Sequence, residues 1–425
     1  MINLKHVLPQ IGVDVNGMKY ILLIGDGMAE NPLDALGWET PLEHASIPTI
    51  DSLAKRGVLG SVLTVPDGFE PGSDTAIMSI FGCSPLKYYS GRAPLELAAM
   101  DIFLEPGDSA MRCNNVALSE GTSFEKRTIL SHSGGGIPGV DGRALAEYLF
   151  GHPEFKAMSD ELGLEIKLTS SYRHLVIAHG IDLGGTHFSP PHDHLDETVL
   201  DNLPSGSTIA SKLSTLLEKA AELLENHPIN VARRAGGKLP ANAAWFWAAG
   251  TAAALPDFNG QYGKTGSVIS AVGLVQGIAK LVGLDVIIVD GATGELETNY
   301  EGKVETALNA LKIKDFVAVH VEAPDECSHA GDISGKLQAI EWFDSRIVAP
   351  VISGLEAMGE DFRVLLLADH KTLCVERTHD GDPVPFLIYD SRKDTGAGLP
   401  YTEKNGESGI YIDDGSGLMG MLFEQ

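Results

Sequence analysis

Carboxylate and imidazole side chains, which can bind metal ions or move protons, follow directly after apolar runs of this sequence. The run Val364–Leu367 leads into Asp369 and His370, and the run Tyr20–Ile24 leads into Asp26 between two glycines. Apolar runs of this length, bounded by charge, are typical of strands in a parallel sheet covered on both faces. One such pair alone favours a structural role: an aspartate that caps the next segment and a histidine bonded to a backbone carbonyl.

Two further stretches repeat the pattern. "FVAVHVEAPDECSH" predicts a strand over Phe316–Val321 and then presents Asp325 and, four residues later, His329. His379 stands just before the apolar run Phe386–Tyr389. Ligands of open α/β sheets bind outside the carboxyl ends of the strands, so side chains at several strand ends can converge in one place. The four stretches together predict a single site.

Predicted strands alternate with amphipathic helices along the chain. A leucine-rich helix is expected over 209–224, a second over 335–358 with a kink at Pro350, and "DVIIVDG" at 285–291 predicts a further strand. This alternation predicts an α/β fold with a mostly parallel sheet. Because Asp26 lies near the N-terminus and the other residues follow position 320, we predict a discontinuous domain, residues 1–106 and 251–425, around an inserted domain of residues 107–250.

The chain is strongly acidic, with 58 Asp and Glu against 31 Lys and Arg among 425 residues and a formal net charge of −27. Such a surface repels nucleic acid, so no nucleic-acid partner is expected. An anionic substrate would need cations concentrated locally, and a bound divalent metal ion supplies that charge.

Residues 1–17 contain a proline, two glycines and no continuous apolar core. We expect a loose extension there, and neither a signal peptide nor a membrane span. The cysteines have neither CxxC spacing nor the density of a disulfide scaffold, which predicts a reduced, cytoplasmic protein: Cys83, Cys113, Cys327 and Cys374.

Ser73, in "PGSDTAIMSIFG", lies at the predicted start of a helix. A serine there can simply cap the helix. The same place lies in the positive field of the helix dipole, which suits a phosphate group or an alkoxide, and a metal ion is one means of activating a serine hydroxyl. Beside the Asp and His residues, we favour a nucleophile.

Taken in order, these Asp, Ser and His residues resemble the metal and nucleophile set of the alkaline phosphatase superfamily. Within it, the closest resemblance is to the archaeal-type cofactor-independent phosphoglycerate mutases. "LLIGDGMAE", "GRAPLELAAMD", "GATGELETNYEGK", "HVEAPDECSHAGD" and "DPVPFLIYD" are similar to that family's patterns, and the resemblance covers nearly the whole chain from Met18 onward. It implies an alkaline-phosphatase-like α/β domain that carries the metals and a smaller inserted α/β or α+β domain that closes over the substrate.

The resemblance also implies residue roles. One divalent metal ion would be bound by Asp325, His329 and His379, and a second by Asp26, Asp369 and His370 with Ser73 close by. This oxygen and imidazole set suits Mn²⁺, with Mg²⁺, Co²⁺ or Zn²⁺ as alternatives. Two metals would clamp the attacking and leaving oxygens of a phosphoryl transfer. Contacts to the phosphate are implied for Arg92 and Lys264, which could equally be surface charges, and contacts to the substrate carboxylate for Arg173 and His174.

The implied reaction is the glycolytic interconversion of 3-phosphoglycerate and 2-phosphoglycerate through a phosphoserine, without 2,3-bisphosphoglycerate. A homoserine kinase-like phosphotransferase or another phosphatase on the same fold is the alternative. The partner is then a small anionic phosphorylated substrate, no membrane partner is expected, and the oligomeric state stays open. After His370 the family usually has a small hydroxyl residue and a Pro two positions later, but this chain has Lys371, Thr372 and Leu373, which puts neighbouring substrate contacts in doubt.

Two motifs suggest other sites. Gly134, Gly136 and Gly139 satisfy the GxGxxG pattern of dinucleotide-binding folds, but Asp160, which has the required spacing, precedes the next predicted strand instead of ending it. We therefore reject a dinucleotide site. A histidine group could hold zinc, but its proline pair and acidic neighbours favour a loop that touches substrate: His187, His192 and His194.

Overall fold

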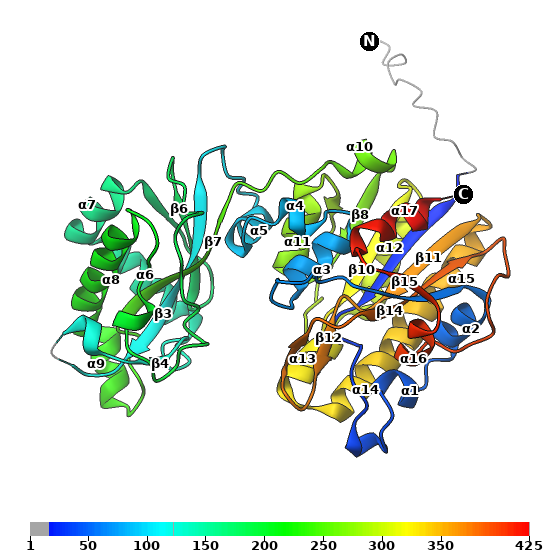
Figure 1. The fold of residues 1–425 in the computed structure, drawn as a ribbon, viewed down its shortest axis with the longest axis horizontal. Helices are drawn as coiled ribbons and strands as arrows, with labels where there is room; N and C mark the ends of the chain where they lie inside the picture. Colours follow the sequence, from blue (N-terminus) through cyan, green and yellow to red (C-terminus); the bar gives the residue numbers. More distant parts are fainter. Residues whose placement is uncertain (1–16, 122, 425) are drawn as a thin grey trace, which may run out of the picture. The chain divides into compact units, whose positions relative to one another are not determined.

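The computed structural model of the chain describes residues 17–121 and 123–424 (Figure 1). The expected extension over residues 1–17 lies outside the described residues, except for Gly17. The chain divides into two compact units. Unit 1 comprises Met1–Pro85, Pro256–Val272 and Val282–Gln425, and unit 2 comprises Leu86–Leu255 and Gly273–Leu281.

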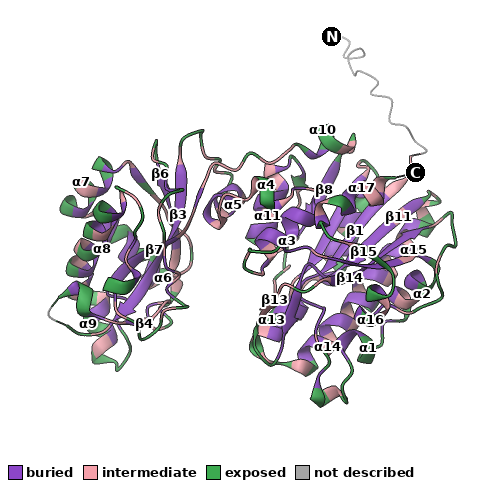
Figure 2. Ribbon diagram, viewed as in Figure 1, coloured by how far each residue is buried: buried purple, intermediate pink, exposed green. Residues whose placement is uncertain are grey.

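Unit 1 contains an eight-stranded sheet in the order β15-β2-β14-β11-β1-β10-β8-β9. Only β14 runs against its neighbours, which confirms the predicted mostly parallel α/β fold. The strands are β1 (Lys19–Gly25), β2 (Val58–Val62), β8 (Gly266–Ile269), β9 (Asp285–Val286), β10 (Phe316–Val321), β11 (Phe362–Leu367), β14 (Val384–Asp390) and β15 (Ile410–Ile412). The central strands are buried along their length, as Figure 2 shows.

Helices pack on this sheet, with α12 on β10 and β8, α2 on β14 and α17 on β11. The helices of unit 1 are α1 (Pro41–His44), α2 (Pro48–Arg56), α3 (Ser73–Ile80), α10 (Phe258–Tyr262), α12 (Tyr300–Leu311), α13 (Ala323–Ala330), α14 (Ile333–Trp342), α15 (Ala349–Met358), α16 (Glu403–Glu407) and α17 (Leu418–Phe423). No helix among the described residues is long and apolar enough to span a membrane.

Two predicted elements of unit 1 differ in detail. The helix expected over 335–358 contains a π-helical segment, Phe343–Val348, directly before α15. Pro350 in the first turn of α15 cannot donate a backbone hydrogen bond, so the irregularity precedes the proline. The strand predicted over 285–291 is wrong beyond Val286, because β9 is the last strand of the sheet and Ile288 is already exposed.

Unit 2 is an antiparallel sheet packed against helices. Its central strand β3 (Ser109–Leu118) pairs with β4 (Ile129–Ser131), β6 (Arg173–Ala178) and β7 (Ala243–Thr251), and β6 also pairs with β5 (Leu164–Lys167). The core forms between this sheet and α6 (Gly139–Gly151), α7 (Pro153–Glu161) and α8 (Ala210–Glu225), with α9 (Pro228–Ala235) following α8. The leucine-rich helix predicted over 209–224 is confirmed as α8.

The bounds of unit 2 differ from the predicted insertion of 107–250. Unit 2 begins at Leu86, within α4 (Pro85–Tyr88), and includes α5 (Arg92–Ala99) and α11 (Gly273–Leu281). These two helices touch so closely that a Cβ atom on Gly277 would lie 1.9 Å from the carbonyl oxygen of Leu95. This contact joins segments far apart in the sequence, so local patterns could not predict it.

The GxGxxG stretch lies between β4 and α6. β4 pairs antiparallel with β3, whereas a dinucleotide-binding βαβ unit needs parallel strands. The rejection of a dinucleotide site is therefore supported by the strand direction.

Candidate active site

The predicted metal ligands of unit 1 lie at one edge of its sheet. Asp26 follows β1, and Asp369 and His370 follow β11. Asp325 and His329 lie on α13, which follows β10 and places the two side chains one helical turn apart. Since β1, β10 and β11 are parallel, their carboxyl ends meet at the same edge.

His379 reaches the same edge although it precedes a strand. It lies on β13 (Thr378–Asp380), which pairs with β12 (Lys371–Leu373) and is followed by β14. Because β14 is antiparallel to β11, the start of β14 lies where β11 ends. The reversed strand thus explains how a histidine ahead of an apolar run joins residues that follow such runs.

Asp325, His329 and His379 form a group that could hold a metal ion, with ligand atoms within 4.8 Å of one another, and we call it the first metal pocket. Each imidazole has its Nδ1 on a backbone carbonyl, at 3.0 Å from Arg377 for His329 and at 3.1 Å from Pro71 for His379. A carbonyl only accepts, so each Nδ1 carries a proton, and the two Nε2 atoms lie 2.9 Å from each other and 3.4 and 3.5 Å from the Asp325 carboxylate. Two imidazole nitrogens and a carboxylate that converge on one point are a donor set that a divalent cation takes, so this pocket fits a metal ion.

The second candidate pocket, which we call the second metal pocket, contains Asp26, Asp369 and His370; the groups there that could hold a metal ion are Asp26 with His320 and Asp369, and Asp26 with Asp325 and His370. Asp369 Oδ1 accepts backbone hydrogen bonds from Gly27 and His370, at 3.1 and 2.9 Å. Among the described residues, the buried Asp369 Oδ2 and Asp26 Oδ1 accept none. These oxygens lie 3.3 and 3.6 Å from His370 Nε2. Two uncompensated carboxylate oxygens beside an imidazole are the donor set that a hard divalent cation takes, and Asp325 lies within reach of this pocket as well.

The pKa values show how strongly these groups interact. Burial, followed by the charges of Asp369 and Asp325, raises the pKa of Asp26 well above its usual range. Burial also acts to raise the pKa of Asp325, but hydrogen bonds with His329 and His379 outweigh it and hold that pKa well below its usual range. The hydrogen bond with Asp325 raises the pKa of His329 to about 9. Carboxylates this close repel one another, and a bound cation would relieve the repulsion.

Ser73 is the first residue of α3, and its Oγ lies 3.1 Å from His370 Nε2. The N-cap of α3 is Gly72, and no side chain caps this helix end. The alternative role considered for Ser73, a helix cap, is therefore wrong. The hydroxyl lies beside the second metal pocket, at a helix N-terminus whose positive field favours an anion.

Unit 2 contains a group of cations that we call the arginine cluster: Arg92, Arg112 and Arg173. Arg112 donates to the Glu96 carboxylate through Nε, at 3.0 Å, and Nη2, and Arg92 Nε lies 3.5 Å from it. Burial acts to raise the pKa of Glu96, but Arg112, Arg92 and Arg173 together hold it below its usual value. Three guanidinium groups around one carboxylate leave local positive charge in a chain with a net charge of −27.

Trp247 lies among these arginines. The guanidinium carbons of Arg112 and Arg173 lie 4.6 and 5.3 Å from its ring, and the imidazole of His192 packs edge-on at 5.0 Å. Trp247 Nε1 donates to Asn114 Oδ1 at 2.9 Å, which fixes the ring. Stacking on an aromatic ring orients a guanidinium group and leaves its edge free for an anion.

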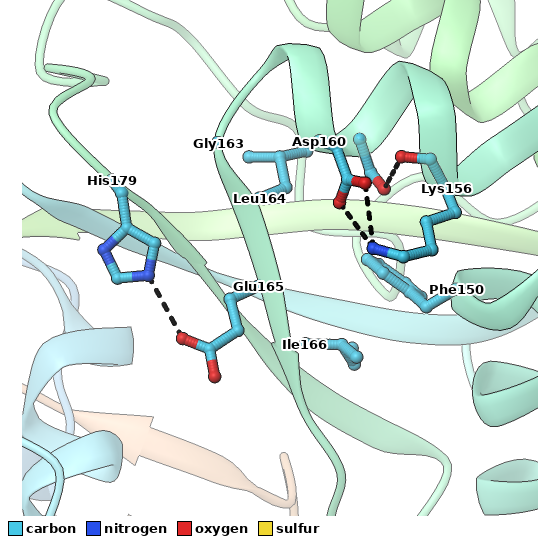
Figure 3. A pocket seen from close by; sticks show the side chains of 9 residues that line it. Phe150, Lys156, Asp160, Gly163, Leu164, Glu165, Ile166 and His179 are labelled. Atoms are coloured by element: carbon cyan, nitrogen blue, oxygen red, sulfur yellow. Dashed lines mark hydrogen bonds and ion pairs between the residues drawn. The ribbon is translucent and has the colours of Figure 1, made fainter.

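A separate surface pocket of unit 2, shown in Figure 3, has a volume of about 410 Å³. Its Lys156 pairs with Asp160 at 2.8 Å, and His179 bridges Asp108 and Glu165 at 3.0 and 3.1 Å. Because every cation in this pocket is already paired with a carboxylate, the pocket does not suit a phosphorylated substrate.

Comparisons with known proteins identify the family of the chain. Residues 18–413 match the model of the Metalloenzyme superfamily. The chain is 45% identical over 410 residues to the 2,3-bisphosphoglycerate-independent phosphoglycerate mutase of Methanosarcina acetivorans, covering 95% of this chain and 99% of that relative. This chain belongs to that mutase family. The resemblance predicted from the motifs is thereby confirmed.

Two solved structures are similar in fold. The PH0037 protein from Pyrococcus horikoshii is 30% identical with a TM-score of 0.75, covering 96% of this chain and 97% of that chain. The cofactor-independent phosphoglycerate mutase from Thermoplasma acidophilum has a TM-score of 0.60 and 24% identity, covering 95% and 98%, and at that identity it supports the fold alone. The mutase family fold therefore extends over nearly all of this chain.

His320 is a site residue that the sequence analysis missed. It lies on β10, fully buried, with Nε2 2.9 Å from Asp26 Oδ2 and Nδ1 3.2 Å from Ser270 Oγ. Burial lowers the pKa of His320 to about 4, so the ring is neutral and its single proton suits the bond to the carboxylate. His320 also belongs, with Asp26 and Asp369, to a group that could hold a metal ion, and its contacts with Asp26 and Ser270 orient the Asp26 carboxylate. Its signal in the sequence was a polar residue inside the apolar run Phe316–Val321.

Arg173 and His174 are adjacent in sequence but have different surroundings in the structure. Alternate residues of β6 face opposite sides, so Arg173 lies against Trp247 while His174 is fully buried. His174 Nε2 lies 3.3 Å from the Gly142 carbonyl and Nδ1 accepts from the Thr169 amide at 3.1 Å. Burial lowers the pKa of His174 to about 4. The expected contact of His174 with substrate is therefore corrected: His174 is a neutral histidine in the core.

Lys264 is also far from the metal pockets. Its Nζ lies 5.0 Å from the ring of Tyr20, near the start of β1. Asp26 lies at the other end of β1, about 20 Å away for six residues of strand. The expected phosphate contact of Lys264 is therefore corrected, since Lys264 stands before a parallel strand and not after one.

The last group of predicted residues is the histidine loop, and its expected contact with substrate stays a prediction. His194 pairs with Glu197 at 2.9 Å, and the backbone of His187 pairs with that of Ser205. Among residues 17–121 and 123–424, the metal-competent groups do not include His187, His192 or His194. His192 instead packs against Trp247 in the arginine cluster's surroundings.

Proposed function

We propose that the chain interconverts 3-phosphoglycerate and 2-phosphoglycerate, with Ser73 carrying the phosphoryl group between the two positions. The observation that supports this most directly is the Ser73 hydroxyl, which lies 3.1 Å from His370 Nε2 beside buried carboxylate oxygens that accept no hydrogen bond in the described chain. A serine beside metal ligands and at a helix N-terminus suits phosphoryl transfer. Membership of the mutase family points to phosphoglycerate as the substrate.

We further propose two divalent cations, Mn²⁺ by preference. Asp325, His329 and His379 would hold one, and Asp26, Asp369 and His370 the other, because the donors in each set are carboxylate and imidazole without thiolate. When bound, the cations would neutralise the transferring phosphoryl group and lower the pKa of the attacking hydroxyl. The buried free thiols of the chain agree with a reducing compartment, and we propose the cytoplasm.

The two half-reactions balance without a second phosphate donor. Ser73 Oγ forms a bond to phosphorus while the bond from phosphorus to O3 of glycerate breaks, and the serine proton ends on O3. In the second half, O2 of the same glycerate bonds to phosphorus, the bond to Ser73 Oγ breaks, and the O2 proton returns to the serine. The N-terminus of α3 stabilises the negative charge near Ser73 in both halves.

We propose that the arginine cluster binds the anionic substrate. Arg173 supports this most clearly, because its buried Nε has no hydrogen-bond partner among the described residues and its Nη2 contacts only the Tyr172 hydroxyl at 3.1 Å. A guanidinium edge held by an aromatic ring is suited to a carboxylate or phosphate. The predicted capping role of the inserted domain stays a prediction.

The test is a rate assay on purified chain stripped of metal and reloaded with Mn²⁺. Formation of 2-phosphoglycerate from 3-phosphoglycerate, without 2,3-bisphosphoglycerate, is followed through enolase. The same preparation is given homoserine and ATP. We expect turnover of 3-phosphoglycerate alone; phosphorylation of homoserine with 3-phosphoglycerate left untouched would replace this proposal.

A further inference from the structure

Thr372 lies between the two metal pockets. It is fully buried on β12, and its backbone pairs with that of His379 on β13. Its hydroxyl contacts Asp325 Oδ1 at 2.6 Å and His370 Nδ1 at 3.2 Å. One side chain thus touches a residue of the first pocket and a residue of the second.

The direction of these two hydrogen bonds follows from the groups involved. The Asp325 carboxylate only accepts, so the threonine donates its single proton to it. The threonine oxygen must then accept from His370, which places the imidazole proton on Nδ1. His370 Nε2 is left with a lone pair, and this is the atom that faces Ser73 Oγ, Asp26 Oδ1 and Asp369 Oδ2.

The backbone around Thr372 holds the hydroxyl in place. The Thr372 amide donates to the Ala29 carbonyl at 3.2 Å, and its carbonyl accepts from Lys336 Nζ at 2.7 Å. The turn after β1 closes over the hydroxyl at Gly27, where a Cβ atom would lie 2.3 Å from Thr372 Oγ1. Gly27 has a φ of +59°, so both its backbone conformation and the lack of space require glycine.

We propose that Thr372 is a positioning residue shared by both metal pockets. Its hydroxyl orients Asp325 in the first pocket and fixes the tautomer of His370 in the second, so that losing one hydroxyl weakens both cation sites. This inference rests on the proposed metal binding, and it adds a residue that coordinates nothing itself. Substitution of a residue that hydrogen-bonds to a metal ligand typically lowers the metal affinity by about 10- to 100-fold.

The test compares Thr372→Val, which keeps the shape and removes the hydroxyl, with Thr372→Ser, which keeps the hydroxyl. Ser328→Ala is the matched control, because Ser328 is a buried hydroxyl on α13 whose proton goes to the Pro324 carbonyl at 2.7 Å. Mn²⁺ titrations of the full chain, with free Mn²⁺ measured by electron paramagnetic resonance, report the affinity of each pocket without substrate.

We expect Thr372→Val to weaken both Mn²⁺ affinities by about 10- to 100-fold, while Thr372→Ser and Ser328→Ala bind as the unaltered chain does. Unchanged affinities in Thr372→Val, or weakening at one pocket only, would overturn the shared role. So would a Thr372→Ser variant as impaired as the valine variant.

A second measurement on the unaltered chain covers the case in which Thr372→Val does not fold. In metal-free, ¹⁵N-histidine-labelled protein at about pH 8, above the ordinary pKa of imidazole, nitrogen NMR identifies the tautomer of His370. We expect the proton on Nδ1; a proton on Nε2 would overturn the proposal. Neither measurement uses phosphoglycerate, so their failure is distinguishable from failure of the proposed activity.

Discussion

Replacing Ser73 by alanine separates the two roles that a serine at the start of α3 can have. The Ser73 hydroxyl bonds to His370 and does not cap α3, whose N-cap is Gly72. Its loss should therefore cost only about 1 kcal/mol of the free energy of unfolding, the usual value for one hydrogen bond. Turnover should fall at least about 10⁴-fold, which corresponds to about 5.5 kcal/mol of activation free energy, because the phosphoryl group has lost its acceptor.

Two measurements on each variant check this prediction. Initial rates of 2-phosphoglycerate formation report the chemistry, and thermal unfolding followed by circular dichroism reports the fold. Ser79→Ala is the matched control, because Ser79 is a fully buried hydroxyl on the same helix without a hydrogen-bond partner among the described residues. A Ser73→Ala protein that turns over at a rate near that of the Ser79→Ala control would refute the nucleophile assignment.

The other predictions concern the metals, the arginine cluster and pH. A chelator should abolish activity and Mn²⁺ restore it, and Asp369→Asn should lose metal content and activity together. Arg173→Ala should raise KM for 3-phosphoglycerate about 10- to 100-fold, the effect of losing one charged hydrogen bond, whereas His174→Gln should lower the melting temperature and leave KM unchanged. Lys264→Ala should leave kcat/KM unchanged, since Lys264 lies beside Tyr20. Burial raises the pKa of Glu403 to about 7, so the folded chain keeps a proton that the unfolded chain releases, and stability falls as pH rises from about 4.5 to 7. Glu403→Gln should remove this slope, on the order of 3 kcal/mol, in denaturant titrations across that range.

Each of these expectations has a contradicting result. Full activity in thoroughly demetallated protein would exclude the metal sites. An unchanged KM in Arg173→Ala would exclude that arginine from substrate binding, and a large loss of kcat in Lys264→Ala would restore Lys264 to the site. For Glu403, which accepts from the Glu30 amide at 3.1 Å and the Thr40 hydroxyl at 2.6 Å with Lys336 nearby, a Gln variant with the same pH slope would contradict the buried-carboxyl explanation.

The metal-pocket residues could be predicted from sequence because they obey a rule of sheet geometry. Parallel strands end at one edge, so Asp26, Asp325 and Asp369 had to meet if their strands were neighbours. The same rule explains why the predicted phosphate contact of Lys264 does not fit the structure. Lys264 precedes β8, at the sheet edge opposite Asp26, and only the family resemblance had placed it in the site. The geometric rule was the better guide there.

Other features depend on contacts that local patterns do not contain. Alternation along β6 shows that Arg173 and His174 face opposite sides, but not which side is the core. Arg112 and His320 each lie inside a strand whose residues are all buried, where a polar residue needs a partner that the local sequence does not identify. The partners, Glu96 and Asp26, come from distant segments, as does the α5 contact that brings α11 into unit 2.

The central claim is that one glycerate molecule gives its phosphoryl group to Ser73 and takes it back on the neighbouring oxygen. The direct measurement uses 3-phosphoglycerate carrying ¹³C in the glycerate and ¹⁸O in the phosphoryl group, mixed with unlabelled 3-phosphoglycerate and Mn²⁺-loaded protein. Mass spectrometry of the 2-phosphoglycerate should find both labels together or neither. Product carrying only one of the two labels, or no 2-phosphoglycerate at all, would contradict the account.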